Sequence, residues 1–248
     1  MSKRNAANVQ TFGCRLNIWE SEVIRDQAGA AGLSDAIIFN TCAVTAEAEK
    51  QARQAIRKAR RDHPDAKIIV TGCAAQIAPE TWAAMPEVTQ VVGNHDKLQA
   101  ASWTKLAAND APSLLVSDVM EVRETASHMV DSFHEHTRAF LQVQQGCDHR
   151  CTFCIIPYGR GNNRSAPASD LIDAARRLVA NGCKELVLTG VDITSWGSDL
   201  PGRPRLGNLV RQILDAVQDL PRLRLSSIDP AETDAELMDV LAEDQRLL

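Results

Sequence analysis

The chain has 248 residues, of which 44% are hydrophobic and 24% charged, a composition typical of a globular protein that buries a sizeable core. No stretch approaches the roughly 18 apolar residues of a membrane span, and the polar amino terminus has no signal-peptide core, so we expect a cytoplasmic protein with no membrane contact. The formal net charge of −5 is unusual for a protein that binds nucleic acids.

Strand and helix patterns alternate through the first hundred residues. We expect strands at 8–13, 35–40, 66–72 and 88–92, with helices at 17–31, 44–61 and 79–85. Strands that alternate with helices predict βαβ crossovers and a parallel sheet. The sequence therefore predicts an α/β fold with a Rossmann-like domain over residues 1–108. A linker is expected over 109–137, where the pattern fades and the sequence becomes polar and rich in histidine.

A second series of strands and helices occupies residues 138–248. We expect strands at 139–144, 184–190 and 223–228, helices at 170–180 and 206–220, and a last helix that begins near Asp234 and runs off the end. Ser169 is expected to cap the first of these helices and Gly182 to end it. Three βα units do not close a barrel, so this domain is predicted to be an incomplete (βα) barrel.

Seven cysteines in a reducing compartment are better explained by metal binding, redox chemistry or burial than by disulfides. The second cysteine set consists of Cys147, Cys151 and Cys154. These residues have the spacing C-x3-C-x2-C directly after an expected strand. Thiolates at this spacing can hold an iron–sulfur cluster or zinc, and three ligands leave one position open. Structural zinc usually has four protein ligands, and His149 could complete such a site.

The first cysteine set, Cys14, Cys42 and Cys73, is dispersed, but each member follows an expected strand and precedes an expected helix. The carboxyl ends of parallel strands meet at one edge of a sheet, so these thiols are expected to converge. Helix amino termini beside them are expected to lower the thiol pKa and favour an anionic cluster. The alternative is three buried hydrophobic cysteines. Cys183 follows a helix end and is interpreted as structural.

Ordered motifs from Thr11 to about Pro230 resemble the radical S-adenosylmethionine methylthiotransferases: GCRLN, NTCAVTAEAE, VTGCAAQ, GCDHRCTFCIIPYGRG, LTGVDITSWG and RLSSIDP. GCRLN and LTGVDITSWG are most similar to the branch that acts on N6-threonylcarbamoyladenosine in tRNA. The branches that act on isopentenyladenosine in tRNA or on a ribosomal protein are the alternatives within the family. The resemblance implies a Rossmann-like methylthiotransferase domain followed by a radical SAM partial barrel.

The resemblance also implies two [4Fe–4S] clusters. The second cysteine set would hold the cluster that binds S-adenosylmethionine, and the first set would hold the cluster that supplies sulfur. The enzyme would add a 2-methylthio group to the modified adenosine beside the anticodon of a tRNA, with electrons from a donor such as a flavodoxin-like reductant. The alternative from another class is a two-cluster electron carrier or scaffold, which leaves LTGVDITSWG and RLSSIDP without a role.

Contacts to S-adenosylmethionine are expected near the second cysteine set. Phe153 resembles the family's aromatic residue beside the adenine of the cosubstrate, with plain packing as the alternative. Catalytic and binding groups gather at the carboxyl ends of barrel strands. The expected contacts at such ends are Thr189, Gly190, Asp192, Ser227 and Asp229. Gly159 and Gly161 are expected to let the backbone approach the cluster, with a plain turn as the alternative.

Positive charge is concentrated locally. Arg53, Arg57, Arg60 and Arg61 are expected on one helix face, which could meet phosphates or form an ordinary solvated surface. Arg160 and Arg164 are expected to meet substrate. Full-length members of the resembled family continue through a longer barrel into an RNA-binding β-barrel domain, and both are expected to be missing after Leu248. That absence would weaken tRNA binding and turnover by this chain and leave an open barrel edge.

Overall fold

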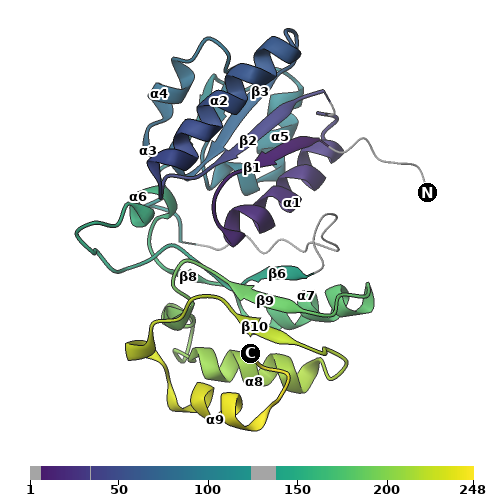
Figure 1. The fold of residues 1–248 in the computed structure, drawn as a ribbon, viewed down its shortest axis with the longest axis vertical. Helices are drawn as coiled ribbons and strands as arrows, with labels where there is room; N and C mark the ends of the chain where they lie inside the picture. The colour runs from purple at the N-terminus through teal and green to yellow at the C-terminus, as the bar shows by residue number, and fades with distance from the viewer. Residues whose placement is uncertain (1–6, 34, 124–137) are drawn as a thin grey trace. The chain divides into compact units, whose positions relative to one another are not determined.

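The computed structural model describes residues 7–33, 35–123 and 138–248 (Figure 1). The chain divides into two compact units, the first made of Met1–Val122 and His149–Gly161 and the second of Arg123–Asp148 and Asn162–Leu248. Each unit is built around a parallel sheet with packed helices, which confirms the α/β class. No helix in the described ranges combines the length and the apolar character that crossing a membrane requires.

The first unit contains a parallel sheet whose strand order, β1-β2-β3-β4-β5, follows the chain. Its strands in the described residues are β1 (Asn8–Thr11), β2 (Ile37–Thr41), β3 (Ile68–Gly72), β4 (Gln90–Val92) and β5 (Leu114–Leu115). Its helices there are α1 (Arg15–Ala30), α2 (Ala46–Asp62), α3 (Cys73–Ile77), α4 (Pro79–Ala83), the 3-10 helix η1 (Asp96–Leu98), α5 (Ala100–Ala107) and α6 (Ile156–Arg160). The order shows no reversal, unlike that of a doubly wound Rossmann sheet.

Helices cover both faces of this sheet. Ile37 and Phe39 of β2 pack in an apolar cluster with Ile56 of α2, whereas Ile38 packs in a separate cluster with Ile24 of α1. Side chains of a strand point alternately to its two faces, so one strand contributes to both clusters. Every residue of β2 and β3 is buried, which is why these strands appear in the sequence as continuous apolar runs.

Five of the described elements of the first unit lie where none was predicted: α3, η1, α5, β5 and α6. β5 pairs with β4 in parallel, with Val91 opposite Leu114. The sheet therefore takes in residues of the expected linker, and the first unit continues past residue 108 to Val122. The rest of that expected linker, residues 124–137 with most of the histidine-rich stretch, lies outside the described residues.

The second unit contains a parallel sheet with strand order β10-β9-β6 and a small antiparallel pair. Its strands in the described residues are β6 (Ala139–Gln142), β7 (Gln144–Gln145), β8 (Arg164–Ser165), β9 (Leu186–Thr189) and β10 (Leu223–Leu225). Its helices there are α7 (Ala168–Ala180), the 3-10 helix η2 (Ile193–Ser195), α8 (Leu206–Ala216), the 3-10 helix η3 (Pro230–Glu232) and α9 (Ala235–Glu243). One apolar cluster, which includes Leu188, Trp196 and Ile213, joins the sheet to these helices.

Two local predictions for the second unit are wrong. Pro167 is the residue before α7, and Ser169 lies inside the helix with its hydroxyl directed at Asp170 rather than at a backbone N–H. The last helix ends at Glu243, after which Leu247 forms a parallel bridge with Leu223 of β10. The edge of β10 is therefore partly paired.

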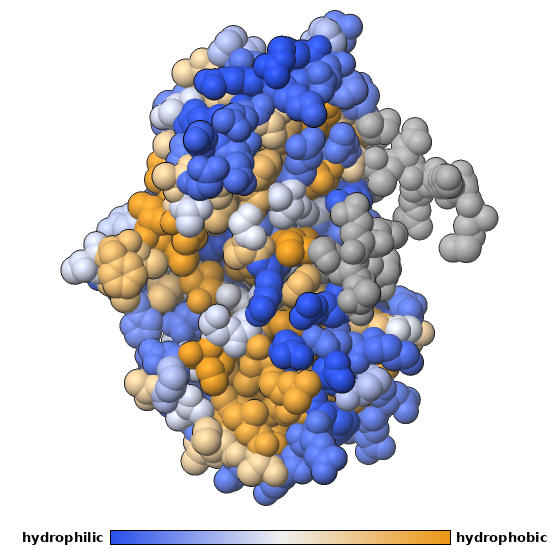
Figure 2. All heavy atoms as spheres, in the orientation of Figure 1, coloured by the Kyte–Doolittle hydropathy of each residue, from blue (hydrophilic) through white to orange (hydrophobic). Residues whose placement is uncertain are grey.

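Apolar side chains are exposed at the end of this unit. Met238 and Leu241 of α9 and the terminal Leu248 are exposed, and Figure 2 shows an apolar area over α9 and the C-terminal residues.

The predicted helix end at Gly182 is confirmed, because Gly182 follows α7 with a φ of 93°, a conformation that glycine adopts without strain.

Candidate metal centres

The first cysteine set lies at the carboxyl ends of three neighbouring strands. Cys14 directly precedes α1, Cys42 directly follows β2, and Cys73 is the first residue of α3. β1 pairs with β2 and β2 with β3, and the pairing runs up to the strand ends. The parallel sheet therefore carries the chain segments that bear these thiols to the same edge.

Two glycines allow the strand ends to approach closely. Gly13 has a φ of 94°, and a Cβ there would lie 2.5 Å from Cβ and 2.6 Å from Sγ of Cys42. Gly72 has a φ of 100°, and a Cβ there would lie 2.2 Å from the backbone oxygen of Thr41. The backbone before Cys14 thus lies against Cys42, and the backbone before Cys73 lies against the residue before Cys42.

The sulfurs have polar neighbours and influence one another. The backbone N–H of Val44 donates to Sγ of Cys42 at 3.5 Å, and Nδ2 of Asn94 donates to Sγ of Cys73, also at 3.5 Å. Burial raises the pKa of the Cys42 thiol; the N–H of Val44 opposes this, and the negative charges of Cys73 and Cys14 raise the pKa further. The expected lowering of the thiol pKa is therefore wrong for Cys42. A bound metal would relieve the repulsion among these sulfurs, so the donor set suits a thiolate-ligated centre.

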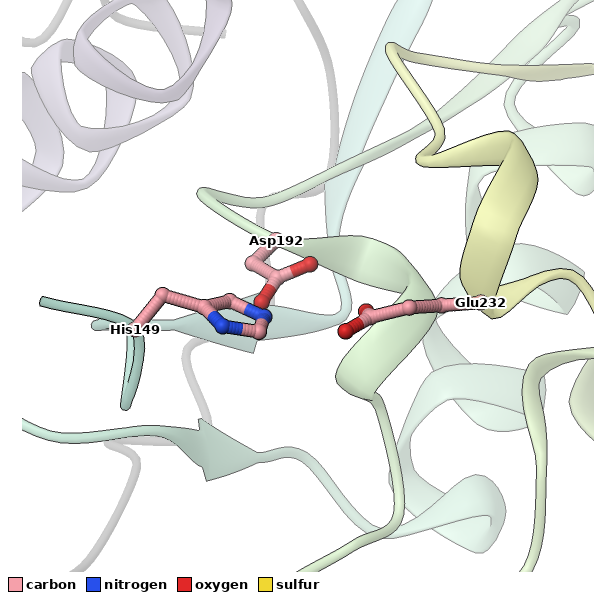
Figure 3. A group of neighbouring side chains, drawn as sticks. All are labelled: His149, Asp192 and Glu232. Atoms are coloured by element: carbon pink, nitrogen blue, oxygen red, sulfur yellow. The ribbon is translucent and has the colours of Figure 1, made fainter. Parts of the chain in front are cut away.

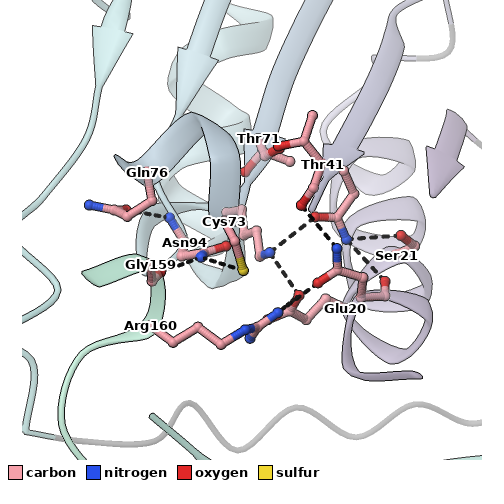
Figure 4. Close-up of polar contacts among 12 residues, drawn as sticks. Glu20, Ser21, Thr41, Thr71, Cys73, Gln76, Asn94, Gly159 and Arg160 are labelled. Atoms are coloured by element: carbon pink, nitrogen blue, oxygen red, sulfur yellow. Dashed lines mark hydrogen bonds and ion pairs between the residues drawn. The ribbon is translucent and has the colours of Figure 1, made fainter. Parts of the chain in front are cut away.

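A buried ionic cluster borders this site (Figure 4). Lys97 Nζ lies 2.8 Å from Glu20 Oε2, and Arg160 lies 2.8 Å from Glu20 Oε1 through one guanidinium nitrogen and 3.1 Å from Oε2 through the other. Arg160 also donates to Asn17 Oδ1 at 2.6 Å, and Lys97 donates to Asn40 Oδ1 at 3.2 Å. The three charged side chains are at most 2% exposed.

The pKa values in this cluster show which charges it stabilises. Burial would raise the pKa of Glu20, but attraction to Arg160 and Lys97 lowers it below its ordinary value. Burial would likewise lower the pKa of Arg160, but attraction to Cys73, Glu20 and Cys14 raises it well above its ordinary value. The pKa of Lys97 is lowered by burial and by Arg160, against attraction to Glu20 and Cys73. Negative charge at Cys73 therefore favours both cations.

The second cysteine set is divided between the units. Cys147 follows β7 in the second unit, and its thiol lies 3.6 Å from Oδ2 of Asp192. Cys151 and Cys154 belong to the first unit, where the N–H of Cys154 donates to the carbonyl of Cys151 at 3.0 Å. Phe153 between them is 91% exposed, so plain packing does not account for it.

The helix that follows Cys154 packs on the first cysteine set. A Cβ at Gly159 of α6 would lie 3.2 Å from Cβ of Cys73 and 3.3 Å from Cδ1 of Ile77, so glycine permits this close approach. Asn94 Nδ2 donates to the carbonyl of Gly159 as well as to Sγ of Cys73. Gly161 ends α6 with a φ of 79°. The segment that carries Cys154 is thus attached beside Cys73.

The predicted cosubstrate contacts in the second unit lie beyond β9 and β10. Thr189 is buried at the end of β9, Ser227 and Asp229 are exposed, and Asp229 accepts from Ala231 N at the start of η3. Asp192 accepts from Ser195 Oγ at 2.8 Å. These five positions, including Gly190, surround strand ends as expected, while their role in binding stays a prediction.

Gln144 and Glu232, which lie outside the motifs, organise this region. Gln144 Oε1 accepts from the N–H groups of Val191 and Asp192, each at 2.9 Å, and a Cβ at Gly190 would lie 2.8 Å from Gln144. The carboxylates of Asp192 and Glu232 point toward one another (Figure 3), and both lie within hydrogen-bond distance of the Thr194 hydroxyl, at 3.0 and 3.3 Å. A cavity of about 500 Å³ opens beside Thr194 and Glu232.

Two predicted arginine roles are wrong. Arg160 is buried against Glu20, so it is not placed to meet substrate. Arg164 is also buried and donates to the carbonyl of Asn162 at 3.0 Å.

Cys183 donates to the carbonyl of Glu185 at 3.2 Å, in keeping with a structural role.

The basic face of α2 is partly used by the protein itself. The guanidinium of Arg53 lies 4.2 Å from the centre of the Trp82 ring, and Arg60 donates to the carbonyls of Pro64, Ala66 and Glu87. Arg57 and Arg61 are exposed, and Figure 2 shows hydrophilic side chains over α2. The face behaves as a solvated helix surface with two internally bonded arginines.

The chain matches two family models in succession. The Uncharacterized protein family UPF0004 matches residues 6–93, and the Radical SAM superfamily matches residues 141–245. A Threonylcarbamoyladenosine tRNA methylthiotransferase MtaB of Rickettsia prowazekii is 52% identical over 97% of this chain and 56% of the relative. The corresponding protein of Bacillus subtilis is 35% identical over 96% of this chain and 54% of the relative. The chain spans about half the length of the curated relatives it matches.

More distant similarities extend to a different modification enzyme and to solved structures. A tRNA-2-methylthio-N(6)-dimethylallyladenosine synthase of Roseiflexus sp. is 31% identical over 95% of this chain and 50% of the relative. The radical S-adenosylmethionine methyltransferase TsrM of Kitasatospora setae, solved with cobalamin and a [4Fe–4S] cluster, superposes with a TM-score of 0.57 at 17% identity. That superposition covers 84% of this chain and 47% of TsrM, and at this identity it is a likeness of fold.

Proposed function

We propose that this chain, which belongs to the radical S-adenosylmethionine methylthiotransferases, carries the cluster-binding regions of an enzyme that adds a 2-methylthio group to N6-threonylcarbamoyladenosine in tRNA. The choice of branch is supported by the 52% sequence identity to a threonylcarbamoyladenosine enzyme, since the identity to the dimethylallyladenosine relative is 31%. Because the chain spans about half of these relatives, the activity of the whole protein is part of the proposal.

The family uses S-adenosylmethionine and [4Fe–4S] clusters, and we assign the cluster ligands to the two cysteine sets. The first set fits such a cluster because Gly13 and Gly72 let its strand ends approach closely and because a buried ionic cluster borders the site. The second set has the short loop and the three thiols that leave one position open for a small molecule. When bound, these groups supply the electron transfer, the radical chemistry and the sulfur.

The chain's own residues would bind and orient the reactants. Phe153 has an exposed ring on which a flat base can stack, and Asp192 has a carboxylate whose position is fixed by Ser195 and by the Gln144 contact to its N–H. We propose that these two residues contact S-adenosylmethionine, together with Thr189, Gly190, Ser227 and Asp229. The position of Asp192 and these four residues beyond β9 and β10 supports their assignment.

The proposed partners follow from this chemistry. The substrate is a tRNA that carries threonylcarbamoyladenosine beside the anticodon, and the electrons come from a low-potential donor such as a flavodoxin-like protein. We propose that the enzyme works in the cytoplasm, where thiols stay reduced and available to clusters.

The decisive experiment begins with anaerobic cluster reconstitution of this chain, followed by reduction in the presence of S-adenosylmethionine. We expect 5′-deoxyadenosine to be formed and its formation to be lost in Cys151→Ala, while the control Cys183→Ala, which changes a cysteine outside both sets, keeps it. If a chain with both clusters forms none, an electron carrier or scaffold becomes the better account. Metal analysis that finds zinc at the second set would contradict the cluster assignment.

The branch is tested with two tRNA substrates. We expect mass spectrometry of digested tRNA to find the methylthio product on threonylcarbamoyladenosine and none on isopentenyladenosine. Because this chain spans about half of its relatives, the same assay on a longer homologue is run in parallel. Preference of that homologue for isopentenyladenosine would overturn the choice of branch.

A further inference from the structure

A cavity of about 500 Å³ opens in the second unit, beyond the ends of β9 and β10. This volume is typical of sites that bind small molecules, which measure roughly 300–1,000 Å³. Its lining includes two arginines, Arg203 and Arg205, and also Glu232. A cavity lined by guanidinium groups and a carboxylate suits a ligand that is anionic at one point and can donate a hydrogen bond at another.

The loop between β9 and α8 holds these arginines in place. Asp199 of this loop accepts from the backbone N–H of Ser165 at 2.9 Å and from the Ser165 hydroxyl at 2.5 Å. Gly197 approaches Pro204 so closely that a Cβ there would lie 2.1 Å from the Pro204 carbonyl oxygen. The loop is thus closed on itself and anchored to β8, which positions its two arginines before any ligand binds.

The two arginines differ in how they are held. Arg205 donates one guanidinium N–H to the backbone carbonyl of Glu232 at 2.8 Å, and a guanidinium has further N–H groups that can bind a ligand. Arg203 is exposed, so its guanidinium is accessible from the solvent. Its backbone has a φ of 46°, a left-handed conformation that is uncommon for residues other than glycine and that often occurs at functional sites.

Another wall of the cavity is joined to a proposed contact of S-adenosylmethionine. Thr194 Oγ1 lies 3.0 Å from Oδ1 of Asp192 and 3.3 Å from Oε2 of Glu232, and Ser195 donates to Oδ2 of Asp192 at 2.8 Å. Figure 3 shows the carboxylates of Asp192 and Glu232 pointing toward one another. A substrate group in the cavity would therefore lie next to the cosubstrate, as a reaction between the two requires.

The substituent of the proposed substrate has the matching chemistry. Threonine joined to N6 of adenine through a carbamoyl group keeps its carboxylate and its hydroxyl. A carboxylate pairs with the fork of N–H groups of a guanidinium, and a hydroxyl can donate to a carboxylate such as that of Glu232. The isopentenyl group of the alternative substrate is a hydrocarbon and offers neither interaction. A cavity with this lining therefore discriminates between the two modifications.

We propose that Arg203 and Arg205 bind the carboxylate of the threonylcarbamoyl group and are the residues that determine specificity for this modification. The inference rests on the proposed function, since it takes the substrate to be the threonylcarbamoyl form of adenosine. It adds to that function the residues that select the substrate and the chemical group that they recognise.

The test measures the binding of nucleosides to the whole chain by calorimetry. The probes are N6-threonylcarbamoyladenosine, its methyl ester, which lacks the negative charge, and N6-isopentenyladenosine. We expect the parent to bind the acid about tenfold or more tightly than either of the other two, the effect of a hydrogen bond to a charged group. Arg203→Gln and Arg205→Gln are each expected to weaken binding of the acid about tenfold and to leave binding of the ester unchanged.

The ester separates recognition of the carboxylate from a structural role. A purely structural role of Arg203 would weaken binding of the acid and the ester alike. Arg203→Lys keeps the charge and is expected to lose less affinity for the acid than Arg203→Gln. Arg177→Gln, which changes an exposed arginine of α7 in the same unit, is the matched control and is expected to change nothing.

The other outcomes are equally clear. A parent that binds acid and ester equally or binds neither, or arginine variants that keep the full preference for the acid, would overturn the inference. The proposed function would then stand, because formation of 5′-deoxyadenosine is measured separately. Arginine variants that bind an unmodified anticodon stem-loop RNA more weakly but keep the preference for the acid would assign the arginines to a backbone phosphate and overturn the inference. A parent that prefers isopentenyladenosine overturns the choice of branch and the proposed function with it.

Discussion

Replacing Gly13 by alanine is predicted to lower the free energy of unfolding by more than the same change in an ordinary turn would. It is also predicted to disturb the first cysteine set. The residue adopts a φ of 94°, and holding alanine in this left-handed region costs about 1–2 kcal/mol. The new Cβ would also lie 2.5 Å from Cβ and 2.6 Å from Sγ of Cys42, and overpacking of this kind costs roughly 1–3 kcal/mol more. The sum is about 2–5 kcal/mol.

Gly32→Ala provides the matched control. Gly32 has a φ of 86°, and a Cβ there would meet nothing within 4 Å, so this variant carries the backbone cost without the clash. Urea unfolding of the two metal-free variants, followed by iron and sulfide determination after reconstitution, separates the two contributions. We expect Gly13→Ala to be less stable than Gly32→Ala and to load the first site poorly, while Gly32→Ala loads as the parent does. Equal stability and equal loading would refute the reasoning.

The remaining predictions concern polar contacts. Glu20→Gln is expected to cost roughly 3–5 kcal/mol at pH 7, because it leaves two buried cations without their carboxylate. The folded pKa of Glu20 is lowered, so its contribution is complete above the ordinary value of 4.5 and is lost as pH falls; urea unfolding should show the two proteins converging in acid. Asn94→Ala removes the bond to the Gly159 carbonyl and is expected to cost about 1–3 kcal/mol, with faster amide exchange in α6 as the specific sign. Gln144→Ala frees the N–H of Asp192 and should weaken S-adenosylmethionine binding by calorimetry; unchanged affinity would speak against Asp192 as a contact.

The predicted elements that the structure confirms share one property: their signal is local. β2 and β3 are buried on both faces, so they appear as unbroken apolar runs, and α2 shows an apolar stripe that repeats at helical spacing. The elements that were missed carry little local signal. α3 is five residues long and β5 is two, and β5 becomes a strand because it pairs with β4.

The ionic cluster shows why part of the site was not predictable. A lysine or arginine in a sequence usually indicates a solvated surface, since such residues are seldom fully buried without a partner. Lys97 and Arg160 are buried because Glu20 lies beside them, and Glu20 is 77 and 140 residues away from them along the chain. A carboxylate on the buried side of α1 was the available signal, but it does not identify its partners.

Three features of the sequence determined by themselves the α/β class, the family and the expected chemistry. They are the order of the motifs, the cysteine spacings and the alternation of strands with helices. Tertiary packing decided which arginine is buried, how closely Gly13 approaches Cys42, and which helix lies beside Cys73. The physical reason is that burial and charge balance depend on residues that are distant in sequence and come together when the sheet and its helices assemble.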